Sequence, residues 1–232
     1  MISVDRLKES IYKDSYFSEV AGSLTVNNEE KPKGNVLSQV ELQSKGRFIC
    51  LSNKILKEGS DIYKPEEKDS CRVSFRRDCD GICLLEIGKR NILLIIEVKS
   101  GFNDVKRKGF DQIAASYVKV RSILQSIEGY NPAEYEELGL LISYPPSAKP
   151  TIPSTSLIEL KKETVAPSAL EKLNNSYNTK LRVDKEVTLN LIDYQVGACH
   201  VNPSLYNPIL HVKHVSVTDQ VNKETINLDS YL

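Results

Sequence analysis

Runs of aliphatic residues in the middle of the chain predict a group of neighbouring strands. Three short strand-like runs, rich together in Val, Ile and Leu, follow one another at Cys71 to Arg76, Gly81 to Ile87 and Asn91 to Val98. Both faces of the third run are apolar, which is typical of a strand that is covered on both sides. We therefore expect a strand buried in the core at Asn91 to Val98.

A helical pattern follows these strands. Between Gly109 and Ile127 the apolar residues are spaced by four and three positions, which places them on one helical face: Ile113, Tyr117, Val120, Leu124 and Ile127. The next run, Leu138 to Tyr144, predicts a strand that stops at two prolines. The order β-β-β-α-β predicts an α/β protein with a central mixed β-sheet flanked by helices.

The segments on either side of this centre are harder to assign. Residues 1–35 predict a helical and linker segment, and Val36 to Leu56 predicts one or two helices at the start of a core that spans 36–146. Residues 147–232 predict a strand-rich C-terminal extension of the same domain, with strands at Val187 to Ile192 and Ile209 to Val212.

Composition limits the class of protein further. A length of 232 residues favours one domain with an elaboration, and 31 basic against 31 acidic residues give no overall charge for a polyanionic partner. The longest strongly apolar run, Ile92 to Ile96, is too short to span a membrane. Five cysteines and no signal-like N-terminus lead us to expect a reducing, cytoplasmic location.

The turn at Gly88-Lys89 predicts the register of a hairpin. A glycine at the first central position suits a two-residue turn, and this turn places Ile87 opposite Arg90 and Asp80 opposite Glu97. Residues directly opposite have Cβ atoms about 4.5–5.5 Å apart. Side chains alternate along a strand, so Lys99 is expected on the face of Glu97.

Two adjacent carboxylates beside a lysine indicate a metal site. The carboxylates repel each other, and burial increases the repulsion. A divalent cation removes it, and Mg²⁺ prefers such oxygen ligands. A lysine at this position can orient or deprotonate a water molecule or stabilise charge on a phosphate.

These residues also form a known motif. Asp80-Gly81, followed by an apolar strand that ends in Glu97-Val98-Lys99, resembles the motif of the PD-(D/E)XK nuclease superfamily over about Val36 to Tyr144. The resemblance implies a restriction-endonuclease-like core. It implies Mg²⁺, with Mn²⁺ able to substitute, bound by Asp80, Glu97 and the main-chain carbonyl of Val98, with Lys99 as the catalytic lysine.

The resemblance also suggests two supporting residues. Glu41 is the candidate for a further metal ligand on a helix that precedes the sheet, directly or through water. Gln112 stands where many members carry a glutamine on the helix after the sheet, and it is expected to support the substrate or the lysine. Ser116 takes the place of a tyrosine that RecB-like members have four residues later.

Local charge suggests where nucleic acid would bind. Nine basic and five acidic residues lie between Arg72 and Lys108. The run Lys106, Arg107 and Lys108 is expected to contact backbone phosphates, unless it is a solvated loop. DNA is favoured over RNA because most of the family cuts DNA.

The expected function is therefore a metal-dependent nuclease, specifically a DNA endonuclease in restriction, repair or recombination. A second copy of the chain is expected if both strands are cut. The alternative is a catalytically inactive nuclease-fold protein that binds nucleic acid or protein. Zinc is disfavoured, because His211 and His214 are expected on opposite faces of a strand.

Overall fold

The protein, seen here as a computed structural model, is described over residues 2–11, 14–28, 37–60, 78–101, 108–144, 185–191, 202, 204, 206–217 and 222–232. Its longer elements are α1 (Val4–Ser10), β1 (Phe17–Asn27), β2 (Gln39–Leu51), α2 (Asn53–Ser60), β3 (Gly81–Ile87), β4 (Arg90–Lys99), α4 (Phe110–Gln125), β5 (Glu136–Ser143), β6 (Lys185–Asn190), β7 (Ile209–Ser216) and β8 (Lys223–Asn227). The predicted α/β class with a mixed sheet is confirmed. No helix in these ranges is long and apolar enough to cross a membrane.

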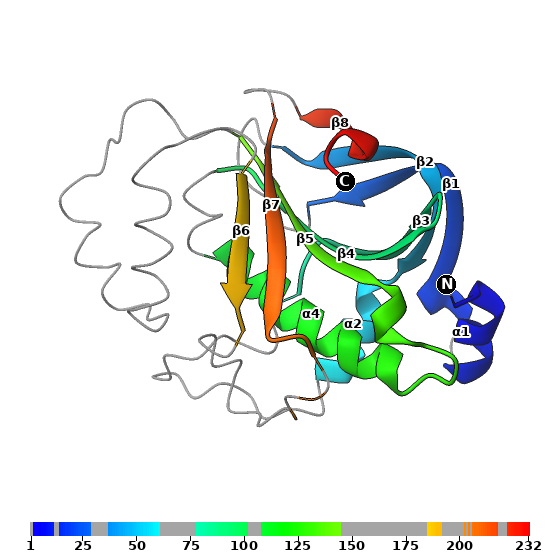
Figure 1. Cartoon of the computed structure of the whole chain (residues 1–232). Helices are drawn as coiled ribbons and strands as arrows, with labels where there is room; N and C mark the ends of the chain where they lie inside the picture. The colour runs from blue at the N-terminus through cyan, green and yellow to red at the C-terminus, as the bar shows by residue number, and fades with distance from the viewer. Residues whose placement is uncertain are drawn as a thin grey trace.

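All eight strands belong to one sheet, in the order β1-β2-β3-β4-β5-β7-β6, with β8 pairing with β2 (Figure 1). The strands from β1 to β4 are antiparallel neighbours, whereas β5 runs parallel to β4 and β7 runs parallel to β5. Strands from 1–35, 36–146 and 147–232 thus all contribute to the same sheet.

The sheet is covered on both faces. On β4, Leu93 and Ile95 belong to a buried cluster that includes residues of α1, α2 and α4. Helix α4 lies across this face in Figure 1. The alternate residues Leu94 and Ile96 belong to a second cluster, which includes Leu42 of β2 and residues of β8 and β5. As predicted, β4 is therefore apolar on both sides.

The prediction of helices over Val36 to Leu56 is wrong for most of its length. This segment forms β2 and only then the helix α2. Val40 and Leu42 are buried while Glu41 and Gln43 are more exposed, which is the two-residue period of a strand. Pairing with β1, β3 and β8 outweighs the helix-like spacing of the apolar residues.

The helical and linker prediction for residues 1–35 is also wrong in part. Helix α1 forms as expected, but β1 begins at Phe17 and runs to Asn27. Its eleven residues pair with β2 along nearly its whole length, with an irregularity between Ala21 and Ser23. The N-terminal segment therefore supplies an edge strand of the sheet.

Where the structure describes the centre of the chain, the predicted elements are confirmed. Strands β3 and β4 pair in the predicted register, which joins Ile87 to Arg90, and Gly88 has a positive φ of 61°. Helix α4 and strands β5, β6 and β7 lie where the hydrophobic pattern predicts them. The strand predicted at residues 71–76 lies outside the described residues.

Candidate functional site

The hairpin of β3 and β4 brings Asp80 to the carboxyl end of β4. The ladder between β3 and β4 ends at Gly81 opposite Ile96, so Asp80 is the residue that precedes the last pair. Its Oδ2 atom accepts a hydrogen bond of 2.8 Å from the main-chain N–H of Val98. The Asp80 carboxylate therefore lies against the backbone between Glu97 and Lys99.

Glu97 and Lys99 form an ion pair in the interior of the protein. The Lys99 Nζ atom lies 2.6 Å from Oε1 of Glu97, and their side chains are 1% and 0% exposed. Both side chains lie on the face of Leu93 and Ile95, because successive residues of a strand alternate. Desolvating two charges is costly, so a buried ion pair of this kind is a candidate for a functional site.

Three side chains of α4 hold the segment that leads into Asp80. The Nε2 atom of Gln112 donates a hydrogen bond of 2.9 Å to the carbonyl oxygen of Asp78. The Ser116 hydroxyl accepts one of 2.8 Å from the main-chain N–H of Cys79. Lys119 forms an ion pair with Asp78. We call Gln112, Ser116 and Lys119 the α4 anchor.

Helix geometry explains why these three residues act together. Their spacing of four and three positions places them on one face of α4. Lys119 is nearly buried, and burial lowers its pKa while the hydrogen bond to Asp78 opposes that shift. The anchor thus fixes two consecutive residues immediately before Asp80.

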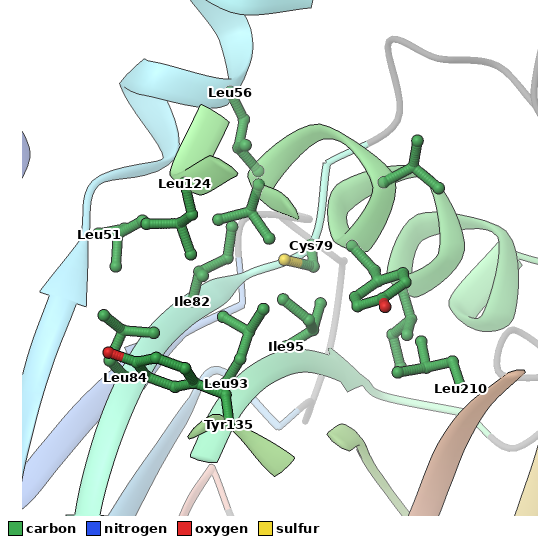
Figure 2. Close-up of a cluster of buried hydrophobic side chains, with 14 of the residues drawn as sticks. Leu51, Leu56, Cys79, Ile82, Leu84, Leu93, Ile95, Leu124, Tyr135 and Leu210 are labelled. Carbon is green, nitrogen blue, oxygen red and sulfur yellow. The ribbon is translucent and has the colours of Figure 1, made fainter. Parts of the chain in front are cut away.

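A second contact holds the same segment from α2. The Nδ2 atom of Asn53 donates to the carbonyl oxygens of Cys79 and Asp80, at 3.0 and 3.1 Å. Between these contacts the Cys79 side chain is buried near Ile82 and Ile95 (Figure 2). Burial raises the pKa of the Cys79 thiol, so this side chain packs as an apolar group and is not a nucleophile.

The other predicted site residues are placed differently. Glu41 lies on β2 and not on a helix, and its Oε1 atom accepts a hydrogen bond of 3.1 Å from Gln43. Its neighbours Val40 and Leu42 face the second buried cluster, so the Glu41 side chain points to the opposite side of its strand. Within the described ranges, Glu41 makes no hydrogen bond or ion pair with Asp80 or Glu97.

The basic run is described only in part. Lys106 and Arg107 lie outside the described residues, while Lys108 is half-buried just before α4. The contact described for Gln112 is the hydrogen bond to the Asp78 carbonyl, which supports the backbone before Asp80. The two histidines lie apart: His211 is exposed and pairs with Glu186, whereas the buried His214 meets the Ser143 hydroxyl.

The donor atoms suit a hard cation. Asp80 and Glu97 supply carboxylate oxygens, and the carbonyl of Val98 adds a third oxygen, which are the ligands that Mg²⁺ prefers. Within the described ranges, no three His, Cys, Asp or Glu side chains form a metal-binding group. Mg²⁺ is commonly bound by one or two carboxylates, with water and phosphate completing the shell.

Sequence reasoning missed Asp78, Lys119 and Asn53, and it named Ser116 without the contact that Ser116 makes with Cys79. One signal was present for Lys119: it is a charged residue between Val118 and Val120 on a largely buried helix. Buried lysines in proteins are usually paired, so an acidic partner can be expected for Lys119. Nothing local indicated that this partner was Asp78, which lies 41 positions away.

Comparison with known proteins identifies no relative for this arrangement. No protein-family model, curated protein or solved structure matches the chain. The function must therefore be argued from the site itself.

Proposed function

We propose that the chain is a Mg²⁺-dependent nuclease with a restriction-endonuclease-like core that hydrolyses phosphodiester bonds, most directly as a DNA endonuclease. The observation that carries this proposal is the buried Glu97–Lys99 pair, with Asp80 hydrogen-bonded to the residue between them. Two acids can hold a metal ion and an amine can orient a water molecule, and metal-assisted phosphoryl hydrolysis can use both.

Each group has a distinct role in this proposal. Asp80, Glu97 and the Val98 carbonyl would hold Mg²⁺. When bound, the ion lowers the pKa of a water molecule and polarises a phosphoryl oxygen. Lys99 orients the attacking water and stabilises negative charge on the phosphate. The α4 anchor and Asn53 position Asp80 through its backbone.

The arrangement around the site supports the core that the motif implies. Strand β4 ends in Glu97-Val98-Lys99, the chain then enters α4, and β5 returns parallel to β4. The crossover helix therefore packs on the face that carries Glu97 and Lys99. Pathways compatible with the proposal are restriction of foreign DNA, repair and recombination.

A cleavage assay tests the proposal. Purified protein is incubated with circular and linear DNA, single- and double-stranded, and with RNA, in Mg²⁺, in Mn²⁺ or in excess chelator. We expect metal-dependent cutting, with cleaved circles establishing endonuclease action. Lys99→Gln should lower the rate by about 100-fold or more, the usual effect of losing an acid–base group. Asp80→Asn should also lower the rate, because it removes the charge of a metal ligand.

Matched exposed residues provide the controls. Lys89→Gln, in the turn of the same hairpin, and Asp5→Asn, in α1, should cut like the parent. The proposal fails if the parent cuts none of the substrates, or if the Asp80 and Lys99 variants retain its rate. Binding of nucleic acid with neither Mn²⁺ uptake in calorimetry nor cleavage would favour an inactive binding module.

A further inference from the structure

A groove of about 660 Å³ borders Asp80. It lies along β1 and reaches the segment in which β2 ends and α2 begins. Asp80, Gly81 and Ile82 form its boundary at the start of β3. The volume is within the range of about 300–1,000 Å³ that is typical of ligand sites, and it suits a short length of one nucleic-acid strand rather than a whole duplex.

The chemistry of the groove favours an anionic ligand. Lys54 and Lys57 line it, and both are exposed. They are three positions apart on α2, so they are neighbours on one face of that helix. Among the described lining residues, Asp80 is the only acid. Hydroxyl groups supply further hydrogen-bond donors, from Ser18, Ser23, Thr25 and Ser52.

The same lining favours contacts to the backbone of a strand over stacking of its bases. The lining residues that the structure describes include no aromatic side chain on which a base could stack. Lysines and hydroxyls are the groups that contact phosphate oxygens, and such contacts position a strand without identifying its sequence.

We propose that this groove binds the phosphodiester backbone of one nucleic-acid strand and leads it to Asp80. The inference rests on the proposed function, because it treats Asp80 as part of the cleavage site. Lys54 and Lys57 contact successive phosphates, and binding is independent of base sequence. The basic run at Lys106 to Lys108 is not needed for this path.

Salt dependence measures the two phosphate contacts directly. Oligonucleotides of single-stranded DNA and of RNA, with one base sequence and with a scrambled one, are titrated with protein in chelator at several salt concentrations. Lys54→Gln/Lys57→Gln should reduce the slope of log K against log salt by roughly 1.4, since each contact to a single strand contributes about 0.7. Scrambling the sequence should leave the affinity unchanged, and comparing the DNA and RNA arms shows which backbone is preferred.

The control variant also loses two lysine charges, but at positions outside the groove. Lys89→Gln/Lys223→Gln changes two exposed lysines that do not line the groove, and its slope should equal that of the parent. The inference is overturned if the Lys54/Lys57 variant keeps the parental slope, if both double variants lose the same amount, or if the parent binds neither probe.

The two proposals can fail separately. A parent protein that binds through Lys54 and Lys57 but cuts no substrate overturns the nuclease and leaves the groove as a binding site. A parent that cuts, while its salt slope does not depend on these lysines, overturns the groove alone. If the parent cuts, Lys54→Gln/Lys57→Gln should have a higher KM and a kcat near the parental value, because the two lysines bind the strand and do not react.

Discussion

Oδ2 of Asp80 accepts a hydrogen bond of 2.8 Å from the main-chain N–H of Val98. This bond joins the residue before β3 to the residue between Glu97 and Lys99. The position of Asp80 therefore depends both on the hairpin register and on whatever holds residues 78–80. A change in the hairpin register or in the contacts of residues 78–80 should displace the Asp80 carboxylate while the rest of the fold stays in place.

Removal of the Ser116 hydroxyl should weaken metal binding. In Ser116→Ala the buried N–H of Cys79 loses its acceptor, which should cost about 1–3 kcal/mol of unfolding free energy. The segment before Asp80 should also become less well ordered. We therefore expect weaker Mn²⁺ binding in calorimetry and a higher Mg²⁺ concentration for half-maximal cleavage.

Ser122→Ala is the matched control for that variant. Ser122 lies on the same helix, and its hydroxyl donates only to the carbonyl of Val118 among the contacts described. Its Mn²⁺ affinity should equal that of the parent. Equal Mn²⁺ affinity in Ser116→Ala would contradict a positioning role for Ser116.

Loss of the Lys119 amine should destabilise the protein strongly. Lys119→Met leaves the largely buried Asp78 carboxylate without this partner, and breaking a buried pair from one side typically costs about 3–5 kcal/mol. Urea unfolding should show this loss. The double variant Asp78→Asn/Lys119→Met should be more stable than Lys119→Met alone, and a single variant that loses less than about 1 kcal/mol would argue against the pair.

Substitution by alanine should lower the free energy of unfolding by very different amounts at two glycines. Gly88 has a positive φ of 61°, and a Cβ there would meet no atom within 4 Å, so Gly88→Ala should cost only about 1–2 kcal/mol. At Gly46 a Cβ would lie 2.3 Å from the carbonyl oxygen of Glu86. Gly46→Ala should therefore destabilise more, because β2 and β3 must move apart. Urea titrations of both variants compare the two losses, and a larger loss at Gly88 would contradict this account.

The Arg90–Glu136 pair should contribute to stability in a pH-dependent way. Arg90 donates from Nε and Nη2 to the Glu136 carboxylate at 2.7 and 2.6 Å, and these bonds hold the Glu136 pKa below its ordinary value of 4.5. The folded protein then binds fewer protons at this group than the unfolded chain does. The contribution is complete above pH 4.5 and is lost as pH falls through the lowered pKa.

Glu136→Gln should remove that part of the acid dependence. Urea unfolding of parent and variant between pH 3 and pH 7 should give a larger difference at neutral pH than at pH 3. A difference that stays constant across this range would show that the Glu136 charge contributes nothing to stability.

The central hairpin could be predicted because its information is local. The turn at Gly88 sets the register, and the apolar run of β4 follows it directly in the sequence. Helix α4 could be predicted for the same reason, since its buried face repeats at helical spacing. Elements that are specified by their own residues were predicted well.

Strand β2 and the α4 anchor could not be predicted, because their information is distant. Gln39–Gln43 of β2 pairs with β1 and with β8, at opposite ends of the chain. Ser116 meets Cys79 across 37 positions. Spacing within a short window cannot reveal such partners, and β2 therefore resembled a helix.

Because β8 pairs in parallel with β2, one edge of β2 is covered only late in protein synthesis. The main-chain N–H and the hydroxyl of Ser38 both donate hydrogen bonds to the carbonyl oxygen of Asn222, 184 positions later, and β8 then covers the flank of Gln39–Gln43. While the ribosome is still translating the intervening codons, this flank of the nascent chain stays uncovered. Open strand edges recruit other chains, so a message truncated before codon 223 should yield an aggregating product that requires chaperones.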